Sequence, residues 1–243
     1  MEKVISCKYG SLTFTTYGGT LLSAIINGQE LLFLSQFSNH PQSPVRGGVP
    51  VCWPWFGVDA RGRHGTVRNQ IWDIIEIHES ESSAIAILST THQDLKLTIT
   101  FSLTNIFKVS LKTTNNGKTF PSFSAALHTY FKAGKIFSVT GLGSSYMDKV
   151  IQKPQNNQKT DIDFQTTVDR VYSIFDSQIA FSNIKMTPLN ADSIVYWNPG
   201  KIAQEMADLQ SPEGFVCIEA AVLERGDLQE GEVVEFGFEV QVE

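Results

Sequence analysis

The protein is a chain of 243 residues with 42% hydrophobic and 18% charged side chains, which is an ordinary globular composition with enough apolar residues for a large core. Its formal net charge of −6 argues against general binding to nucleic acids or anionic membrane surfaces, since both need a broad basic face. The N-terminus lacks the apolar core of a signal peptide, no apolar run approaches the length of a membrane span, and the three cysteines form no C-x-x-C pair.

These exclusions set the expectations for the whole chain. Because no internal repeat or long low-complexity linker divides the sequence, residues 1–243 are expected to form one domain. We expect a cytoplasmic protein and a monomer that binds neither nucleic acid nor membrane. We also expect no disulfide framework, no metal site and no cofactor.

The N-terminal segments alternate apolar and polar residues with a period of two, which is typical of half-buried antiparallel strands. The alternation covers Leu12–Tyr17 and Thr20–Ile26. The dipeptide Asn27-Gly28 follows at once. It predicts a two-residue hairpin turn, because both central positions of such a turn need positive φ.

The segment from Arg46 to Arg68, RGGVPVCWPWFGVDARGRHGTVR, concentrates positive charge in an acidic protein. It contains four of the six arginines, a single acid and no lysine. Guanidinium groups suit bidentate binding of phosphate or carboxylate, and the indoles of Trp53 and Trp55 suit stacking on a sugar or base. The segment therefore suggests a pocket for a small anionic ligand. The alternative is a solvated loop whose arginines pair with surface acids.

The middle of the chain returns to the alternation of strands. Leu95–Leu103 places five apolar side chains on one face, and Ile106–Thr113 continues the pattern. Asn116-Gly117 then predicts a second two-residue hairpin turn.

Two histidines have contexts that suit chemistry. His128 lies in the largely apolar run SFSAALHTYFKAG, where it could be a hydrogen-bonded core residue or a general acid, since histidine titrates near pH 6.5 when unperturbed. Both interpretations remain open on the residues alone. His64 precedes Gly65 in a loop-like segment, where a histidine can donate a hydrogen bond to a ligand.

The C-terminal part adds further strands and a single candidate helix. Ser193–Trp197 and Val233–Val242 alternate as strands do, and KIAQEMADL places Ile202, Met206 and Leu209 on one helical stripe. Many short strands with few helix-length periodic runs favour a β-sandwich over a wound α/β sheet. The sequence therefore predicts an all-β fold, a large antiparallel β-sandwich with few short helices.

Glu219 is the candidate carboxylate of this region. It lies in GFVCIEAAVLE, and a glutamate inside a buried strand is costly unless it is paired or hydrogen-bonded. Buried carboxylates are enriched at functional sites, although structural ion pairs give the same signal. Neither G-x-S-x-G nor a Walker loop occurs, which removes the common hydrolase and nucleotide-binding motifs.

Taken together, seven segments resemble the aldose 1-epimerase superfamily, and most closely its hexose-6-phosphate mutarotase branch. In chain order they are RGGVPVCWPWFG (46–57), RHGTVRNQIWDI (63–74), ALHTYF (126–131), GLGSSYMDKV (141–150), DRVY (169–172), VYWNPG (195–200) and FVCIEAA (215–221). The match spans most of the chain, so it is far more specific than any single motif.

The resemblance implies a galactose-mutarotase-like β-sandwich that holds a sugar in a cleft on one sheet. It implies interconversion of the α and β anomers of a hexose 6-phosphate without metal or cofactor. In that family the matching histidine, His128, is the general acid and the matching glutamate, Glu219, is the general base. The positions that match the family's substrate contacts are Arg46, His64, Arg68 and Asp148.

Two departures from the family pattern concern the pocket. The usual H-G-F-A-R reads His64-Gly65-Thr66-Val67-Arg68 here, which removes an aromatic side chain, and Arg63 stands where some relatives carry a glutamine. Both changes bear on sugar preference more than on reaction type.

The proposed roles require a protonated His128 and an ionised Glu219 near pH 7, placed on opposite sides of the reacting centre. Two alternatives stay open. One is a mutarotase for unphosphorylated aldoses, and the other is a non-catalytic sugar-phosphate-binding protein on the same sandwich.

Overall fold

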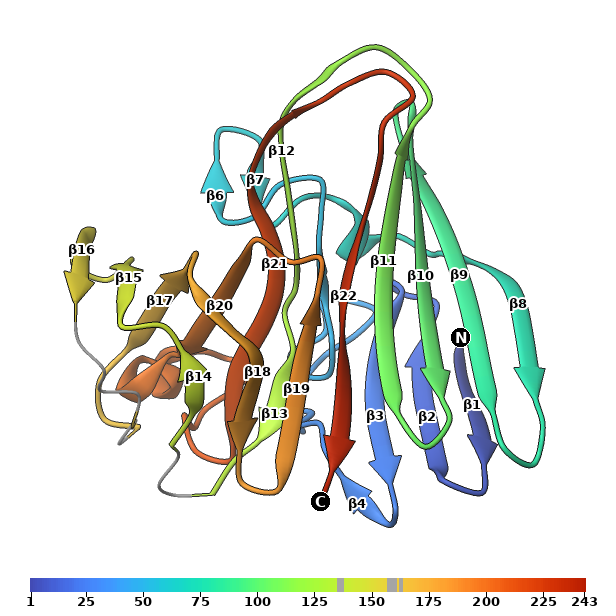
Figure 1. Ribbon diagram of the computed structural model, residues 1–243, viewed down its shortest axis with the longest axis horizontal. Coiled ribbons are helices and arrows are strands. Elements are labelled where there is room, and N and C mark those ends of the chain that lie inside the picture. Colours follow the sequence, from blue (N-terminus) through green and yellow to red (C-terminus); the bar gives the residue numbers. More distant parts are fainter. Residues whose placement is uncertain (135–137, 157–160, 162–163) are drawn as a thin grey trace.

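The structure is a computed structural model that describes residues 1–134, 138–156, 161 and 164–243. Its described part is built almost entirely of antiparallel strands (Figure 1), which confirms the predicted all-β class. Among these residues, no helix has the length and apolar character that crossing a bilayer would demand.

Three sheets carry the architecture. The first has the strand order β1 (Glu2–Cys7), β2 (Gly10–Thr15), β3 (Thr20–Ile26) and β4 (Gln29–Glu30). The second has the order β14 (Thr140–Leu142), β18 (Phe175–Phe181), β19 (Ile184–Leu189), β22 (Val233–Val242), β11 (Phe107–Asn115), β10 (Leu95–Leu103), β9 (Ala84–His92) and β8 (Asp73–Glu79).

The third sheet is the one that matters for function. It has the order β16 (Lys153–Asn156), β15 (Ser145–Asp148), β17 (Val168–Tyr172), β20 (Ser193–Asn198), β21 (Phe215–Leu228), β12 (Phe120–Leu127) and β5 (Val51–Cys52), and β13 (Tyr130–Lys132) also pairs with β21. The other elements are a hairpin of β6 (Val58–Asp59) and β7 (Gly62–Arg63) and the 3-10 helices η1 (Val67–Asn69) and η2 (Gly200–Glu205).

The period-two patterns predicted the strands well. The predicted segments at residues 20–26, 95–103 and 233–242 have the bounds of β3, β10 and β22, and the other three overlap β2, β11 and β20. In β10 the five alternating apolar side chains from Leu95 to Leu103 are all buried. Alternation is reliable here because each of these strands buries one face against the core.

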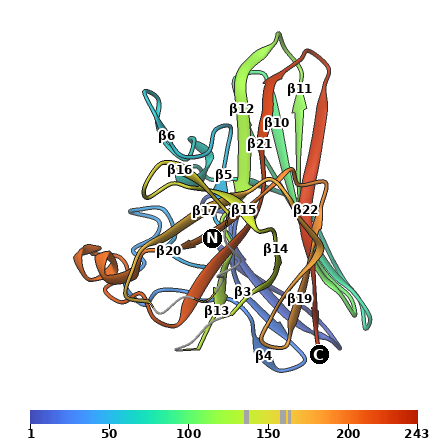
Figure 2. The ribbon, with the colours of Figure 1, turned by 60° about the vertical axis from the view of Figure 1, so that its left-hand side comes forward.

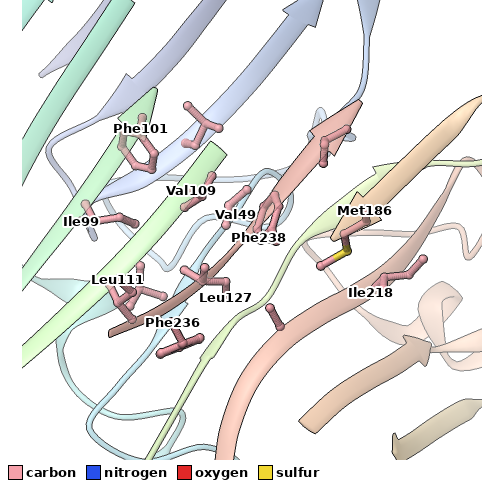
Figure 3. Packing of buried hydrophobic residues seen from close by; sticks show 14 of the residues in the cluster. Val49, Ile99, Phe101, Val109, Leu111, Leu127, Met186, Ile218, Phe236 and Phe238 are labelled. Atoms are coloured by element: carbon pink, nitrogen blue, oxygen red, sulfur yellow. The ribbon is translucent and has the colours of Figure 1, made fainter. Parts of the chain in front are cut away.

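The main core lies between the inner faces of the sheets. Figure 3 shows Val109 and Phe236 of the second sheet around Leu127 of the third, and Met186 of the second sheet beside Ile218 of the third. On β21, the side chains of Val216, Ile218, Ala220 and Val222 belong to this core. Because successive side chains of a strand point to opposite faces, Cys217, Glu219 and Ala221 lie on the outer face of the third sheet. The β6–β7 hairpin and η2 lie on that outer side (Figure 2).

The two predicted hairpin turns have different outcomes. Asn27-Gly28 joins β3 to β4 as predicted, with φ values of 51° and 83°. The hairpin predicted at Asn116-Gly117 is wrong, because β11 already pairs with β10 and β22 and the chain crosses to the third sheet instead. The buried Asn115 side chain donates to the carbonyls of Lys118, Leu228 and Gln229, so it joins the two crossovers that arch over one end of the molecule (Figure 1).

The helix predicted in KIAQEMADL is shorter than expected and of the 3-10 type. η2 covers Gly200–Glu205 only. Ile202 is exposed, whereas Leu209 is buried beyond the end of the helix, so the predicted apolar stripe does not form. Helix η2 instead packs Ala203 against a small cluster with Tyr130 and Phe215.

Candidate active site

Strand register brings His128 and Glu219 together across 91 positions of sequence. Leu127 at the end of β12 pairs with Ala220, and Tyr130 in β13 pairs with Cys217. His128 lies between these two pairings, with its backbone N–H donating to the carbonyl of Pro50 at 2.9 Å. This places its ring beside Glu219 on the outer face of β21.

The two side chains lie side by side. The Nδ1 atom of His128 is 3.3 Å from Oε1 of Glu219, and Glu219 is only 1% exposed. Neither Nδ1 nor either carboxylate oxygen has a hydrogen-bond partner among the described residues. The expected placement on opposite sides of a reacting centre therefore does not hold. Buried polar atoms without hydrogen-bond partners are costly. This pair is therefore a candidate for binding a ligand that supplies those partners.

Burial changes the titration of both groups. It raises the pKa of the Glu219 carboxyl well above its ordinary value, and the nearby Asp169 carboxylate adds to the rise. It lowers the pKa of His128 well below its ordinary value, with His64 and Arg46 contributing. Both shifts favour the form of the free pair in which Glu219 carries the proton and His128 is neutral. This differs from the protonated histidine and ionised glutamate expected from the sequence, because desolvation disfavours both charges.

The pair opens onto a cavity of about 480 Å³ on the outer face of the third sheet. The residues that carry charge or can hydrogen-bond along its wall are Arg46, Arg63, His64, Arg68, His128, Tyr130, Lys149, Asp169, Trp197, Asp208 and Glu219. This volume is in the usual range for a small-molecule site. Five of the six site residues predicted from the sequence line the cavity.

Arg46 and Arg68 occupy different electrostatic situations. Arg46 donates from Nε to Asp208 at 3.0 Å and from a terminal nitrogen to the Tyr130 hydroxyl at 2.9 Å, so its charge is compensated. Arg68 donates only to the Arg63 carbonyl at 3.0 Å, and its buried Nε has no partner among the described residues. Burial, together with Arg46 and Arg63, lowers the pKa of Arg68. Arg68 is therefore a cation of the cavity wall that no carboxylate of the described residues neutralises.

His64 is held as a neutral hydrogen-bond donor. Its Nδ1 accepts from the backbone N–H of Gly57 at 3.1 Å, which leaves the proton on Nε2. Burial and the charges of Arg68, Arg63 and Arg46 lower its pKa to about 3. The following Gly65 has φ +71°, and a Cβ there would lie 1.8 Å from the carbonyl oxygen of Trp53. Only glycine fits this position, which explains the His-Gly pair.

Asp148, the fourth predicted substrate contact, does not line the cavity. It pairs with Arg170 across β15 and β17, and its carboxylate accepts from the backbone N–H groups of Val150 and Ile151. Asp169 precedes Arg170 in β17, so its side chain points to the opposite face of the sheet from that of Arg170. Asp169 does line the cavity. Burial raises the pKa of Asp169. The DRVY segment could have indicated this residue, because core packing of Val168 and Tyr172 turns Asp169 outward.

Aromatic rings shape the wall around His128, but not the rings suggested by the sequence. His128 stacks on Tyr130 at 4.9 Å and meets Trp197 edge-on at 5.5 Å. Trp53 is fully buried in the core and donates to Thr113, so it cannot stack on a ligand. Trp55 lies outside the wall as well, under the Arg61 guanidinium.

The site offers an acid–base pair, the guanidinium of Arg68 with no ion pair among the described residues, and several further donors and acceptors. Such a set can move a proton between two adjacent oxygens of a bound polyol and hold an anionic group. The Cys217 thiol also lies close to the pair: donor atoms of His128, Cys217 and Glu219 are all within 4.8 Å of one another.

Comparison with known proteins places the chain in a family. The model of the aldose 1-epimerase family matches residues 4–241. An Escherichia coli K12 protein named "Putative glucose-6-phosphate 1-epimerase" is 31% identical over 235 residues, which cover 86% of this chain and 79% of that protein. A protein of the same name from Cenchrus ciliaris is 31% identical over 244 residues, with 86% and 74% covered.

Solved structures of similar fold support the same assignment. A crystal structure of a mutarotase from Salmonella typhimurium, itself titled "putative", has a TM-score of 0.87 at 25% identity and covers 98% of this chain and 89% of its own. The galactose 1-epimerase from Lactobacillus acidophilus NCFM shares the fold, with a TM-score of 0.72 at 15% identity over 100% of this chain and 94% of its own. The chain therefore belongs to the aldose 1-epimerase family of isomerases.

Proposed function

We propose that the protein interconverts the α and β anomers of a hexose 6-phosphate, the activity for which its E. coli and Cenchrus ciliaris relatives are named. The observation that carries the proposal is the buried His128–Glu219 pair, which has no hydrogen-bond partner and opens onto a cavity with an uncompensated Arg68. The pair suits acid–base chemistry, and the arginine suits a phosphate.

Mutarotation opens and recloses a hemiacetal. A base takes the proton of the anomeric hydroxyl while an acid protonates the ring oxygen, the open aldehyde rotates about C1–C2, and the ring closes on the other face. The two oxygens are bonded to the same carbon, so an acid and a base that lie side by side at 3.3 Å suit them better than groups across a hollow. Each group is expected to contribute roughly 10²–10⁴-fold.

One shared proton is enough for the cycle. With Glu219 as base and His128 as acid, ring opening leaves a protonated carboxyl and a neutral imidazole, which are then ready to close the ring. The free pair favours that second form, so the proton moves to His128 when substrate binds. A sugar hydroxyl that donates to Glu219 favours the ionised carboxylate and assists this transfer.

The remaining polar groups of the wall are assigned to the substrate's other oxygens. Arg68 binds the phosphate through its free guanidinium edge, while Arg46, fixed by Asp208 and Tyr130, adds positive potential. His64 is assigned as a donor from Nε2 to one sugar hydroxyl, and Asp169 as an acceptor from another. Asp148 is not proposed as a contact.

The direct test uses freshly dissolved α-glucose 6-phosphate and follows its anomeric equilibration by polarimetry or NMR. We expect the rate to rise in proportion to protein concentration, and kcat/KM to be higher for glucose 6-phosphate than for glucose. Equal kcat/KM for both sugars would favour the mutarotase for unphosphorylated aldoses. Binding without acceleration would favour the non-catalytic protein.

The shifted pKa values predict the pH dependence of kcat/KM. The active pair holds one proton, so the rate falls where both groups are protonated and where both are deprotonated. Because burial lowers the pKa of His128, the acid limb should lie well below pH 6.5; because burial raises the pKa of Glu219, the alkaline limb should lie well above pH 4.5.

The pH profile needs a control substrate, because a phosphate monoester itself titrates near pH 6. Glucose lacks that group and should show the same two limbs. NMR titration of the free protein would assign the acid limb, and a His128 imidazole that titrates at about 6.5 would mean that burial leaves its pKa ordinary. That result would contradict the effect of burial described here.

A further inference from the structure

We propose that His128 and Glu219 of the cavity wall, together with the buried Cys217 beside them, form a binding site for a zinc-type divalent ion, and that such an ion is a reversible inhibitor of the enzyme. The binding part stands on the geometry alone, whereas the inhibition rests on the function proposed above for His128 and Glu219.

The donor set is of the kind that zinc selects. A thiolate, an imidazole and a carboxylate are three of the usual zinc ligands, and three protein ligands with one open position are typical of accessible zinc sites. Among the described residues, His128, Cys217 and Glu219 form a group whose donor atoms lie close enough together to hold an ion. Its ligands come from β21 and from the link between β12 and β13, so no spacing motif in the sequence reveals it.

The spacing of the donors fits a tetrahedral ion. Metal–ligand distances of about 2.0–2.3 Å place neighbouring donor atoms roughly 3.3–3.6 Å apart in such a site. His128 Nδ1 and Glu219 Oε1 are 3.3 Å apart already. The Cys217 sulfur lies within 4.8 Å of both, so closing the site needs a movement of about 1 Å.

A second observation points to a ligand at this place. Nδ1 of His128 and both oxygens of Glu219 are buried without hydrogen-bond partners among the described residues. Cys217 and Glu219 are two positions apart on β21, so their side chains point to the same face of the sheet. The ion would enter through the cavity, because His128 and Glu219 line it and the His128 side chain is 12% exposed.

Charge balance favours a soft ion over a hard one. On binding, the Cys217 thiol loses its proton to solvent as the sulfur–metal bond forms, so the thiolate and the carboxylate neutralise a divalent charge. This offsets repulsion from Arg68. Magnesium, which prefers oxygen ligands in octahedral geometry, does not suit the set.

The bound ion would occupy the atoms that the proposed reaction uses. Nδ1 of His128 and the Glu219 carboxylate could no longer exchange a proton with a sugar. We therefore expect ZnCl₂ to inhibit anomer equilibration, a chelator to restore the rate, and MgCl₂ to have no effect. Glucose 6-phosphate at saturating concentration should protect against zinc.

The decisive readout is spectroscopic and independent of activity. CoCl₂ added to the metal-free protein should produce tetrahedral cobalt bands together with a sulfur-to-cobalt charge-transfer band in the near ultraviolet. Cys217→Ala should abolish the charge-transfer band and raise the zinc concentration for half-inhibition by at least about 10–100-fold, measured against the variant's own uninhibited rate. Cys217→Ser is the second variant, in case alanine impairs folding.

Cys52 provides the matched control. Cys52 is a buried cysteine on β5 that lines the same cavity, but it does not belong to the group of His128, Cys217 and Glu219. Cys52→Ala should keep both the cobalt band and the zinc sensitivity. The proposal is overturned if cobalt gives no charge-transfer band, or if the band and zinc sensitivity survive in Cys217→Ala and Cys217→Ser. A protein that binds cobalt in this way but lacks mutarotase activity would leave the site standing and refute the proposed function.

Discussion

Glu219→Gln and His128→Ala are each expected to lower kcat for glucose 6-phosphate by at least ~10²-fold, with little change in KM. Each change removes one of the two groups that must exchange a proton with the sugar. Glutamine keeps the shape of Glu219 but can neither take up nor release that proton. The measurement is anomer equilibration above the spontaneous rate, with near-native circular dichroism as the test of folding.

The double variant sharpens this prediction. If the two groups act on one shared proton, His128→Ala combined with Glu219→Gln should be hardly slower than either single variant, since removing one member already stops the exchange. Independent contributions would multiply instead. Multiplied losses would contradict a shared proton between Nδ1 and Oε1 at 3.3 Å.

Matched controls come from the same chain. Glu224 lies on β21 like Glu219, but it is exposed and accepts a hydrogen bond from Ser173 outside the cavity. His78 is exposed on β8. Glu224→Gln and His78→Ala should therefore keep kcat within about twofold of the wild type. Turnover near the wild-type rate in His128→Ala or Glu219→Gln would remove that residue from its proposed role.

Arg68→Ala is expected to reduce kcat/KM for glucose 6-phosphate by roughly 10–150-fold. It should reduce kcat/KM for glucose much less. The reason is the loss of a charge-assisted bond to the phosphate, which is worth about 1.5–3 kcal/mol. Arg68 is the best candidate for this bond because its Nε is buried without a partner among the described residues and no carboxylate there neutralises it.

Two other arginines serve as comparisons. Arg61 is ion-paired with Asp59 at 2.6 Å in an exposed position, so Arg61→Ala should leave both sugars unaffected. Arg46 is bound to Asp208 and Tyr130, so Arg46→Ala should also harm turnover of glucose, because it disturbs the wall next to His128. Equal losses for both sugars in Arg68→Ala would show that this arginine supports the fold rather than the phosphate.

The zinc site adds a practical point to these experiments. Trace zinc would mimic a loss of catalysis, so kinetic comparisons should be made with a chelator present. The same treatment separates the pH dependence of the pair from that of metal binding, since ligands must lose protons to bind an ion.

The sequence alone determined the strands and the family. Period-two alternation predicted β3, β10 and β22 with their bounds, because one face of each strand is buried and the other is not. The motifs around His128 and Glu219 singled out both residues, and apolar neighbours on both sides of Glu219 indicated its burial. These are local properties, which the order of residues along a strand fixes directly.

Tertiary structure decided what local order could not. The Asn116-Gly117 hairpin failed because the edges of β11 were already taken by strands distant in sequence. Asp169 rather than Asp148 faces the cavity, since pairing and core packing orient β17. Asp208 neutralises Arg46 across 162 positions and leaves Arg68 free, and Cys217 meets His128 only through the pairing of β13 with β21. Charge compensation, desolvation and ligand grouping depend on through-space distances, which arise only when the sheets pack.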